Sequence, residues 1–136
     1  LQAAKDALGE VTFVVGYRDK NLFLKEDMEQ YGKVLIATED GSCGTCGNVI
    51  DAIKEHGSQA DMIFSCGPMP MLKAVKQFAQ ENNIEAFISL EERMACGVGA
   101  CLGCVCKTKK VDHHSHVNNA RICVDGPVFD ATEVEI

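Results

Sequence analysis

Four cysteines near the carboxyl end of the chain have a spacing that suits an iron–sulfur cluster. Residues 96–104 read CGVGACLGC, so Cys96, Cys101 and Cys104 follow a C-x4-C-x2-C pattern, and Cys123 lies further along. This pattern is typical of a plant-type [2Fe-2S] site, in which three thiolates on one loop and a distant fourth bind the two irons. The spacing predicts that these four cysteines are the ligands of such a cluster.

The residues between these cysteines are small, and the same chemistry requires that. Gly97, Gly99 and Gly103 allow the backbone to fold closely around a cluster, adopt positive φ and direct N–H groups at the sulfur atoms. Such donors matter because an oxidised cluster with four thiolates carries a charge of about −2, which must be stabilised away from bulk water.

Two alternatives remain open for this constellation. A zinc site is the first, although zinc sites usually pair their thiols as two C-x2-C knuckles, which the glycine-rich x4 spacing fits poorly. The second concerns the fourth ligand, for which Cys106 is nearer in sequence. Cys106 is only two residues beyond Cys104, whereas a returning strand could bring the distant Cys123 to the loop. The pattern therefore favours Cys123.

Composition limits the classes of function. The chain has 136 residues, of which 46% are hydrophobic, enough for one compact domain with a small appendage. A net charge of −7 without a basic stripe argues against nucleic acid and anionic membranes as partners. No apolar run approaches the roughly 18 residues of a membrane span. Eight clustered cysteines and no export signal favour metal or redox chemistry in the cytoplasm.

Ahead of the cysteine loop, strand-like and helix-like segments alternate. Such an order calls for buried parallel strands joined by right-handed crossovers, with helices on both faces. The predicted strands are 11–17, 34–38, 62–65 and 86–90, and the predicted helices are 1–8, 22–31, 48–56 and 69–81. No strand precedes the first helix and no G-x-G-x-x-G fingerprint is present. The pattern predicts an α/β fold with an incomplete doubly wound parallel sheet.

The character of the chain changes after Leu90. A glycine- and cysteine-rich loop leads into short strand-like runs at 105–109, 120–124 and 128–129, with HHSHVNN as a hairpin turn. We therefore expect a nucleotide-binding lobe over 1–90 and a small β-rich [2Fe-2S] domain over 91–136. The second domain has too little apolar material to fold alone, so a bound prosthetic group is expected to hold it together.

Longer runs resemble a known family. SLEERMACGVGACLGCVCKTK and RICVDGPVFDATEV resemble the carboxyl-terminal end of the electron transfer subunits of type B dihydroorotate dehydrogenases. VGYRDKNLF, TEDGSCGTCGNVIDAI and FSCGPMPML are similar to the pyridine-nucleotide lobe of these subunits, which belong to the ferredoxin–NADP reductase superfamily. The resemblance covers essentially the whole chain. The family's flavin-binding barrel and the first strand and glycine loop of its lobe are expected upstream of Leu1, so the chain is expected to be a fragment.

The resemblance implies a relay of electrons between NADH, FAD, the [2Fe-2S] cluster and a partner, the FMN-containing dihydroorotate dehydrogenase catalytic subunit, in pyrimidine synthesis. A flavin is needed because a hydride carries two electrons and a cluster accepts one. It also implies that Cys96, Cys101, Cys104 and Cys123 are the ligands. The fragment itself is expected to bind one cluster but neither FAD nor, with useful affinity, NADH, and to be inactive alone.

Contacts with the nucleotide follow from the same resemblance. Cys66, Gly67 and Pro68 match the motif beside the nicotinamide in related reductases, and Gly16 and Arg18 match a G-x-R stretch. The alternatives are a small buried cysteine followed by a helix start, and an arginine exposed at a strand end.

The loop after the second predicted strand carries both acids and thiols. Glu39 and Asp40 follow a strand end, where an acid could bind ribose hydroxyls and repel a 2′-phosphate, which favours NADH over NADPH; a solvated loop acid is the alternative. Cys43 and Cys46 depart from the family, and C-x-x-C at a helix start could be a redox pair. Without a thioredoxin-like context, incidental loop thiols are favoured.

The hairpin histidines and the cysteine loop also allow other assignments. His113, His114 and His116 could bind a metal, but a solvated hairpin tip is favoured. Rival functions are a related flavin subunit of a sulfide dehydrogenase or a ferredoxin:NAD(P) oxidoreductase, and, from another class, a structural zinc-binding interaction module. A missing first strand would expose a sheet edge, so self-association of the fragment is also expected.

Overall fold

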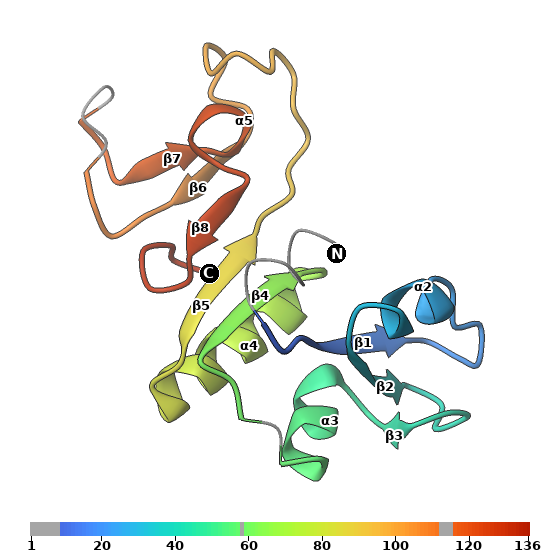
Figure 1. Cartoon of the computed structure of the whole chain (residues 1–136). Helices are drawn as coiled ribbons and strands as arrows, with labels where there is room; N and C mark the ends of the chain where they lie inside the picture. Colours follow the sequence, from blue (N-terminus) through green and yellow to red (C-terminus); the bar gives the residue numbers. More distant parts are fainter. Residues whose placement is uncertain (1–8, 58, 112–115) are drawn as a thin grey trace. The chain divides into compact units, whose positions relative to one another are not determined.

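The computed structural model of the chain describes residues 9–57, 59–111 and 116–136. The chain divides into two compact units, Leu1–Gln59 and Ala60–Ile136. Figure 1 shows the elements of both units in sequence colours. The predicted helix at residues 1–8 lies outside the described residues.

The first unit is built around a parallel sheet. Its described strands have the order β1-β2-β3 and run over Thr12–Tyr17, Lys33–Thr38 and Thr45–Cys46. The helices α2 (Lys25–Glu29) and α3 (Val49–Glu55) connect or follow these strands. Asn48 caps α3 through a capping box with Asp51, which explains why the helix begins there. Apart from Tyr17, β1 is only half-buried or exposed, against the expectation of full burial, because the two helices are short.

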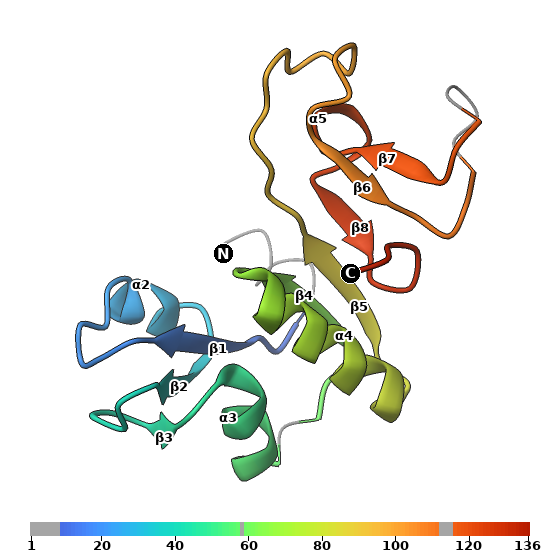
Figure 2. The same ribbon diagram turned by 180° about the vertical axis from the view of Figure 1, so that it is seen from behind.

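The second unit joins an α/β part to a β-rich part. β4 (Met62–Cys66) and β5 (Glu85–Ser89) pair in parallel, with α4 (Met69–Asn82) as the crossover. β8 (Val128–Asp130) pairs antiparallel with β5, beside which it lies in Figures 1 and 2. β6 (Val105–Lys107) and β7 (Asn119–Arg121) form an antiparallel hairpin, and α5 (Ile122–Asp125) follows.

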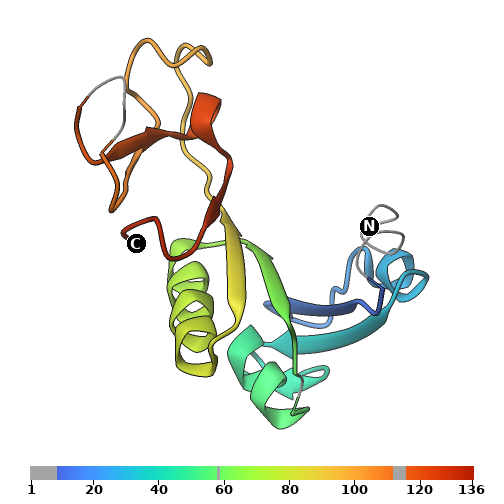
Figure 3. The same cartoon turned by 60° about the vertical axis from the view of Figure 1, so that its left-hand side comes forward.

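One hydrophobic core runs through the second unit. Its buried residues come from α4, from β5 and from the segments after residue 100: Leu72, Ala79, Ala86, Ile88, Leu90, Cys104, Ile122, Phe129, Ala131 and Val134. Lys76 of α4 donates a hydrogen bond from Nζ to the carbonyl of Val134 at 2.5 Å. Figure 3 shows α4 running along β5, with the chain from β8 to the carboxyl terminus near its amino-terminal end. The predicted domain boundary at residue 90 thus falls inside a packed core.

The predicted fold class is confirmed: the chain is α/β with parallel strands, followed by a β-rich segment. Two elements differ from the expectation. The helix predicted at 22–31 is limited to α2, because Leu24 directly before it has φ +61, a left-handed conformation that a right-handed helix cannot include. The strand predicted at 120–124 ends at Arg121, because the carboxylate of Asp125 accepts the N–H of Arg121 and closes a helical turn.

Within the described ranges, every helix is too short or too polar to cross a bilayer.

Candidate iron–sulfur centre

The hairpin of β6 and β7 brings the distant cysteine to the cysteine loop. Val105 pairs with Arg121, so the residues just outside this pair, Cys104 and Ile122, are also neighbours, and the N–H of Ile122 donates to the carbonyl of Cys104 at 2.9 Å. The next residue is Cys123, in the first turn of α5, and its N–H donates to Sγ of Cys104 at 3.4 Å. A returning strand does bring Cys123 to the loop, although Cys123 itself stands on a helical turn.

Backbone N–H groups point at the loop sulfurs, as the glycine content predicts. Val98 donates to Sγ of Cys96 at 3.5 Å, and Gly103 donates to Sγ of Cys101 at 3.4 Å. Hydrogen bonds from backbone amides favour the anionic form of a sulfur, which is the form that binds metal. The loop is therefore arranged to stabilise negative charge.

The four thiols lie in two hydrogen-bonded pairs. The N–H groups of Val98 and Cys101, the thiol of Cys101 and the N–H of Ala100 lower the pKa of Cys96 to about 6. The pKa of Cys123 is raised, first by its hydrogen bond with the thiol of Cys104 and then by desolvation. Cys96 is thus paired with Cys101, and Cys104 with Cys123.

Burial differs across the site. Cys104 is buried, Cys101 is exposed, and Cys96 and Cys123 are intermediate. Four apolar side chains next to the cysteines in sequence are more than half exposed, namely Met94, Val98, Leu102 and Val124. One side of the site therefore reaches the surface, with apolar groups around it.

Two backbone positions in the loop are specialised. Gly99 has φ +77, and a Cβ there would lie 2.8 Å from Cγ2 of Val124, so no larger residue fits without a shift. Leu102 has φ +55, a left-handed conformation that costs a non-glycine residue about 1–2 kcal/mol. Such strain is concentrated at functional sites. Nothing in the identity of Leu102 could have predicted it.

The donor set fits a two-iron cluster. Among the described residues, no three His, Cys, Asp or Glu side chains are grouped around a point where one metal ion would bind. A [2Fe-2S] cluster does not require such a group, because four thiolates are shared between two irons. Two thiol pairs with backbone donors on the sulfurs provide the required chemistry.

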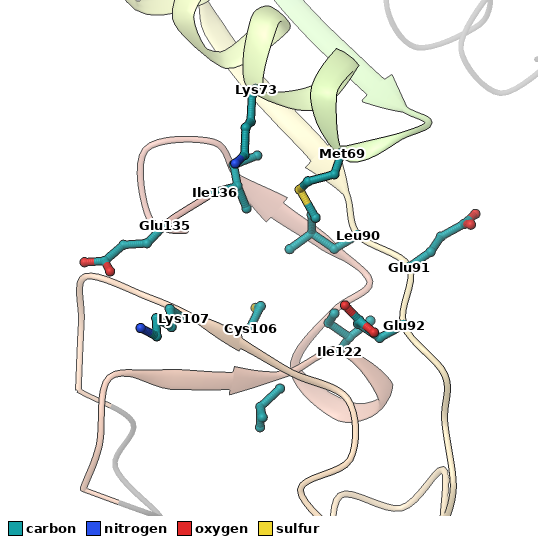
Figure 4. A pocket seen from close by; sticks show the side chains of 11 residues that line it. Met69, Lys73, Leu90, Glu91, Glu92, Cys106, Lys107, Ile122, Glu135 and Ile136 are labelled. Atoms are coloured by element: carbon teal, nitrogen blue, oxygen red, sulfur yellow. The ribbon is translucent and has the colours of Figure 1, made fainter.

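Cys106 is directed elsewhere. Its side chain lines a pocket of about 250 Å³ between the start of α4, the segment after β5 and the last residues of the chain, as Figure 4 shows. Burial raises the pKa of this thiol. Leu90, Ile122 and Ile136 also line the pocket, together with charged residues such as Lys73 and Glu92, so it lies at the edge of the core. This position favours Cys123 over Cys106 as the fourth thiol of the site.

The predicted nucleotide contacts are divided between the two units. In the first, Gly16 is the last residue but one of β1, Arg18 follows the strand, and Glu39 follows β2. The N–H of Asp40 donates to the carbonyl of Arg18 at 3.4 Å, so the two strand ends adjoin. Glu39 is exposed. These residues lie at the carboxyl ends of parallel strands, where ligands bind in open α/β sheets.

In the second unit, Cys66, Gly67 and Pro68 connect β4 to α4. Cys66 is exposed, which excludes the alternative of a small buried residue, and its thiol lies 3.8 Å from Oε1 of Glu91. Pro68 has an extended backbone and immediately precedes the helix. The role of all six residues in binding a nucleotide stays a prediction.

The remaining chemical candidates are separate from this site. Cys43 is held through its backbone: its N–H donates to Oγ1 of Thr38 at 3.2 Å, and its carbonyl accepts from the same hydroxyl at 2.7 Å. Cys46 is in the short strand β3, which the sequence did not predict. Of the hairpin histidines, His116 is exposed, while His113 and His114 lie outside the described residues.

The chain combines parallel α/β strands with a cysteine loop whose amides are directed at the sulfurs. Comparison with known proteins shows what this combination is similar to. Residues 91–135 match the family described as the iron–sulfur cluster binding domain of dihydroorotate dehydrogenase B. The predicted resemblance to the electron transfer subunits of type B dihydroorotate dehydrogenases is confirmed by the following relatives.

The dihydroorotate dehydrogenase B (NAD⁺) electron transfer subunit of Bacillus velezensis is 43% identical over 127 residues, which are 93% of this chain and 47% of the relative. The corresponding subunit of Listeria monocytogenes serotype 4a is 46% identical in an alignment of 139 positions, which covers 99% of this chain and 52% of the relative. A solved chain of an NADH-dependent reduced ferredoxin–NADP oxidoreductase, reported for flavin-based electron bifurcation, has a TM-score of 0.83 and 29% identity, over 98% of this chain and 47% of its own. The chain spans about half the length of the proteins it matches.

Proposed function

We propose that this chain is part of an electron transfer subunit that relays electrons between NADH and FAD on one side and an FMN-containing dihydroorotate dehydrogenase catalytic subunit on the other. A [2Fe-2S] cluster bound by Cys96, Cys101, Cys104 and Cys123 connects the two. The observation that carries this proposal is the set of backbone N–H donors on the sulfurs of Cys96, Cys101 and Cys104, the last of them from Cys123.

The pairing suggests how the thiols divide between the two irons. Cys96 and Cys101 would hold one iron, and Cys104 and Cys123 the other. When bound, such a cluster accepts and donates one electron at a time. The amides of Val98 and Gly103 stabilise the anionic sulfurs.

The exposed side of the loop is where we place the partner subunit. Cys101 is exposed, and the apolar side chains of Val98 and Leu102 beside it are 74% and 57% exposed. Apolar side chains around a polar site are more stable when another protein covers them. The names of the relatives support a dihydroorotate dehydrogenase as this partner.

Each unit, taken by itself, contributes candidate residues for binding the nucleotide. We assign Gly16, Arg18 and Glu39 to one part of NADH and the Cys66-Gly67-Pro68 turn to the nicotinamide. An exposed acid after β2 favours NADH, because a carboxylate repels a 2′-phosphate. FAD and tight NADH binding are assigned to the longer subunits that the relatives represent. Eight free cysteines suit the reducing cytoplasm.

Reconstitution of the protein with iron and sulfide under anaerobic conditions tests this proposal. We expect about two irons and two sulfides per chain, visible absorption, and a paramagnetic signal after one-electron reduction. C123S should abolish loading, whereas the matched control C106S should retain it. A colourless protein that binds zinc, or equal loading of both variants, would contradict the proposal.

A second candidate function is supported by the structural neighbour, a ferredoxin–NADP oxidoreductase chain that is 29% identical to this one. In that case the partner would be a different redox protein, and the cysteine loop would be the same. Reduced, cluster-loaded protein mixed with a dihydroorotate dehydrogenase catalytic subunit or with ferredoxin distinguishes the two. Faster reoxidation by ferredoxin than by the FMN subunit would favour the second candidate.

A further inference from the structure

Arg121 connects the two parts of the cysteine site, although its own side chain binds no metal. It ends β7 and immediately precedes α5, two residues before Cys123. Its guanidinium contacts two different segments, one on each side of the site.

The first contact is with Asp125 in α5. The backbone N–H of Arg121 donates to Oδ2 of Asp125 at 2.7 Å, Nε donates to the same oxygen at 3.1 Å, and Nη2 donates to Oδ1 at 3.4 Å. The side chains are 19% and 33% exposed. These bonds from Nε and Nη2 to one carboxylate fix the guanidinium, and the bond from the backbone N–H closes the helical turn that carries Cys123. Because the two side chains are partly buried, solvent ions screen their charges less than those of a surface pair.

The second contact is with the cysteine loop. Nη1 of Arg121 donates to the carbonyl of Gly99 at 3.4 Å. A Cβ on Gly99 would lie 3.3 Å from the same nitrogen, so the guanidinium lies directly against this residue.

The carbonyl of Gly99 and the N–H of Ala100 belong to one peptide group and point in opposite directions, because the peptide is planar and trans. Ala100 lies in the loop between Cys96 and Cys101. A cation on the carbonyl side polarises the peptide and strengthens the N–H donor on the other side. Arg121 is therefore in contact with the backbone that lies between two of the candidate ligands.

We propose that Arg121 is a positioning residue that holds the Gly99–Ala100 peptide toward Cys96 and whose charge raises the reduction potential of the bound cluster. This inference rests on the proposed function. Reduction adds one negative charge to the cluster, so a nearby fixed cation stabilises the reduced state more than the oxidised state.

Redox titration of the reconstituted protein, followed by visible absorption and by electron paramagnetic resonance, tests the proposal. In R121Q we expect the ratio of reduced to oxidised cluster at a fixed potential to fall about tenfold, which is a decrease of about 59 mV for one electron. R121K keeps the charge but cannot bind Asp125 and Gly99 together, so its potential should lie between those of R121Q and the unmodified protein.

K110Q is the matched control. Lys110 pairs with Glu133 on the surface of the same unit, where the two side chains are 80% and 40% exposed. The K110Q substitution therefore removes one cation that does not contact Gly99. Its potential should stay that of the unmodified protein.

The outcomes separate the inference from the function. If the unmodified protein binds no two-iron cluster, the proposed function fails. If it binds one, and R121Q and K110Q have the same potential, the inference alone fails. If R121Q loads no cluster while R121K does, the lysine has restored the charge, which supports the inference. If both Arg121 variants fail to load although circular dichroism finds them folded, arginine serves only the folding of the loop, and the inference is overturned.

Discussion

Two glycine- and cysteine-rich loops, one in each unit, use the same residue types for different purposes. The first loop, residues 39–47, follows β2 and contains Cys43 and Cys46; the second, residues 95–104, precedes β6 and contains three cysteines. In the first loop the hydroxyl of Thr38 binds both the N–H and the carbonyl of Cys43. The backbone groups there are used to fold the loop.

In the second loop the backbone groups are used for the sulfurs. The N–H groups of Val98 and Gly103 donate to Cys96 and Cys101, and the N–H of Cys123 donates to Cys104 from a separate element. Cysteine and glycine content alone therefore does not make a cluster site. The direction of the amides does, and an element from elsewhere in the chain must complete the set.

The largest expected effect comes from replacing one cysteine in each loop by serine. C104S should abolish iron loading, because it removes a buried ligand with a hydrogen bond from Cys123. C43S should load as well as the unmodified protein. Iron and sulfide analysis after reconstitution measures both, and loss of iron in C43S would break the comparison.

Truncated core side chains, one in each unit, test whether the cysteine loop depends on the hydrophobic core of its own unit. I88A removes a fully buried side chain from the core of the second unit and should cost about 2–5 kcal/mol of that unit's stability. L35A makes a similar truncation in β2 of the first unit. In a denaturant titration that follows the visible absorption of the cluster, the midpoint should fall for I88A and stay unchanged for L35A. An equal fall in both would mean that the cluster depends on the first unit as well.

Two glycines of the second loop sharpen the comparison further. Gly97 and Gly99 both have left-handed φ, +69 and +77, but only at Gly99 would a Cβ meet neighbouring atoms within 4 Å. G97A should therefore cost about 1–2 kcal/mol of backbone strain, and G99A about 1–3 kcal/mol more from crowding against Val124. The rate of iron loss to a chelator measures the difference, and identical rates would show that crowding at Gly99 is relieved.

The smallest effect is on thiol reactivity in the metal-free protein. With a pKa of about 6, Cys96 is mostly thiolate at pH 7, so its alkylation should be nearly constant above pH 7 and fall about tenfold per unit below pH 6. The lower nucleophilicity of a low-pKa thiolate reduces the advantage at pH 7 to about fourfold over a thiol of pKa 9. Cys106, whose pKa is raised by burial, should react slowly throughout. Mass spectrometry locates each modification, and a rate for Cys96 that rises steadily from pH 7 to pH 9 would contradict the directed amides.

Local patterns predicted most of the elements. Apolar runs gave β1, β2, β4 and β5, and the periodicity and capping residues gave α3 and α4 close to their observed bounds. The cysteine spacing put three of the candidate ligands on one loop, and their role as ligands stays a prediction. These features depend on residues near one another in sequence.

The features that sequence did not predict depend on distant contacts. β3 is two residues long and exists only through pairing with β2, and the turn of α5 that carries Cys123 depends on the carboxylate of Asp125. No sequence pattern indicated a functional role for Arg121, although it is two residues from Cys123. Its hydrogen-bond partner Gly99 is 22 residues away in the chain. The core across residue 90 likewise results from pairing of β8 with β5, which no local pattern reveals.

The pairing of β8 with β5 also fixes a distance within the second unit. Cys66, Ser89 and Val128 form one row across three hydrogen-bonded strands, and Val128 is five residues from Cys123. A row of this kind cannot stretch without breaking strand pairs. The distance from the turn at Cys66 to Val128, which follows the segment of Cys123, is therefore fixed by strand pairing, so these two parts of the second unit keep their spacing.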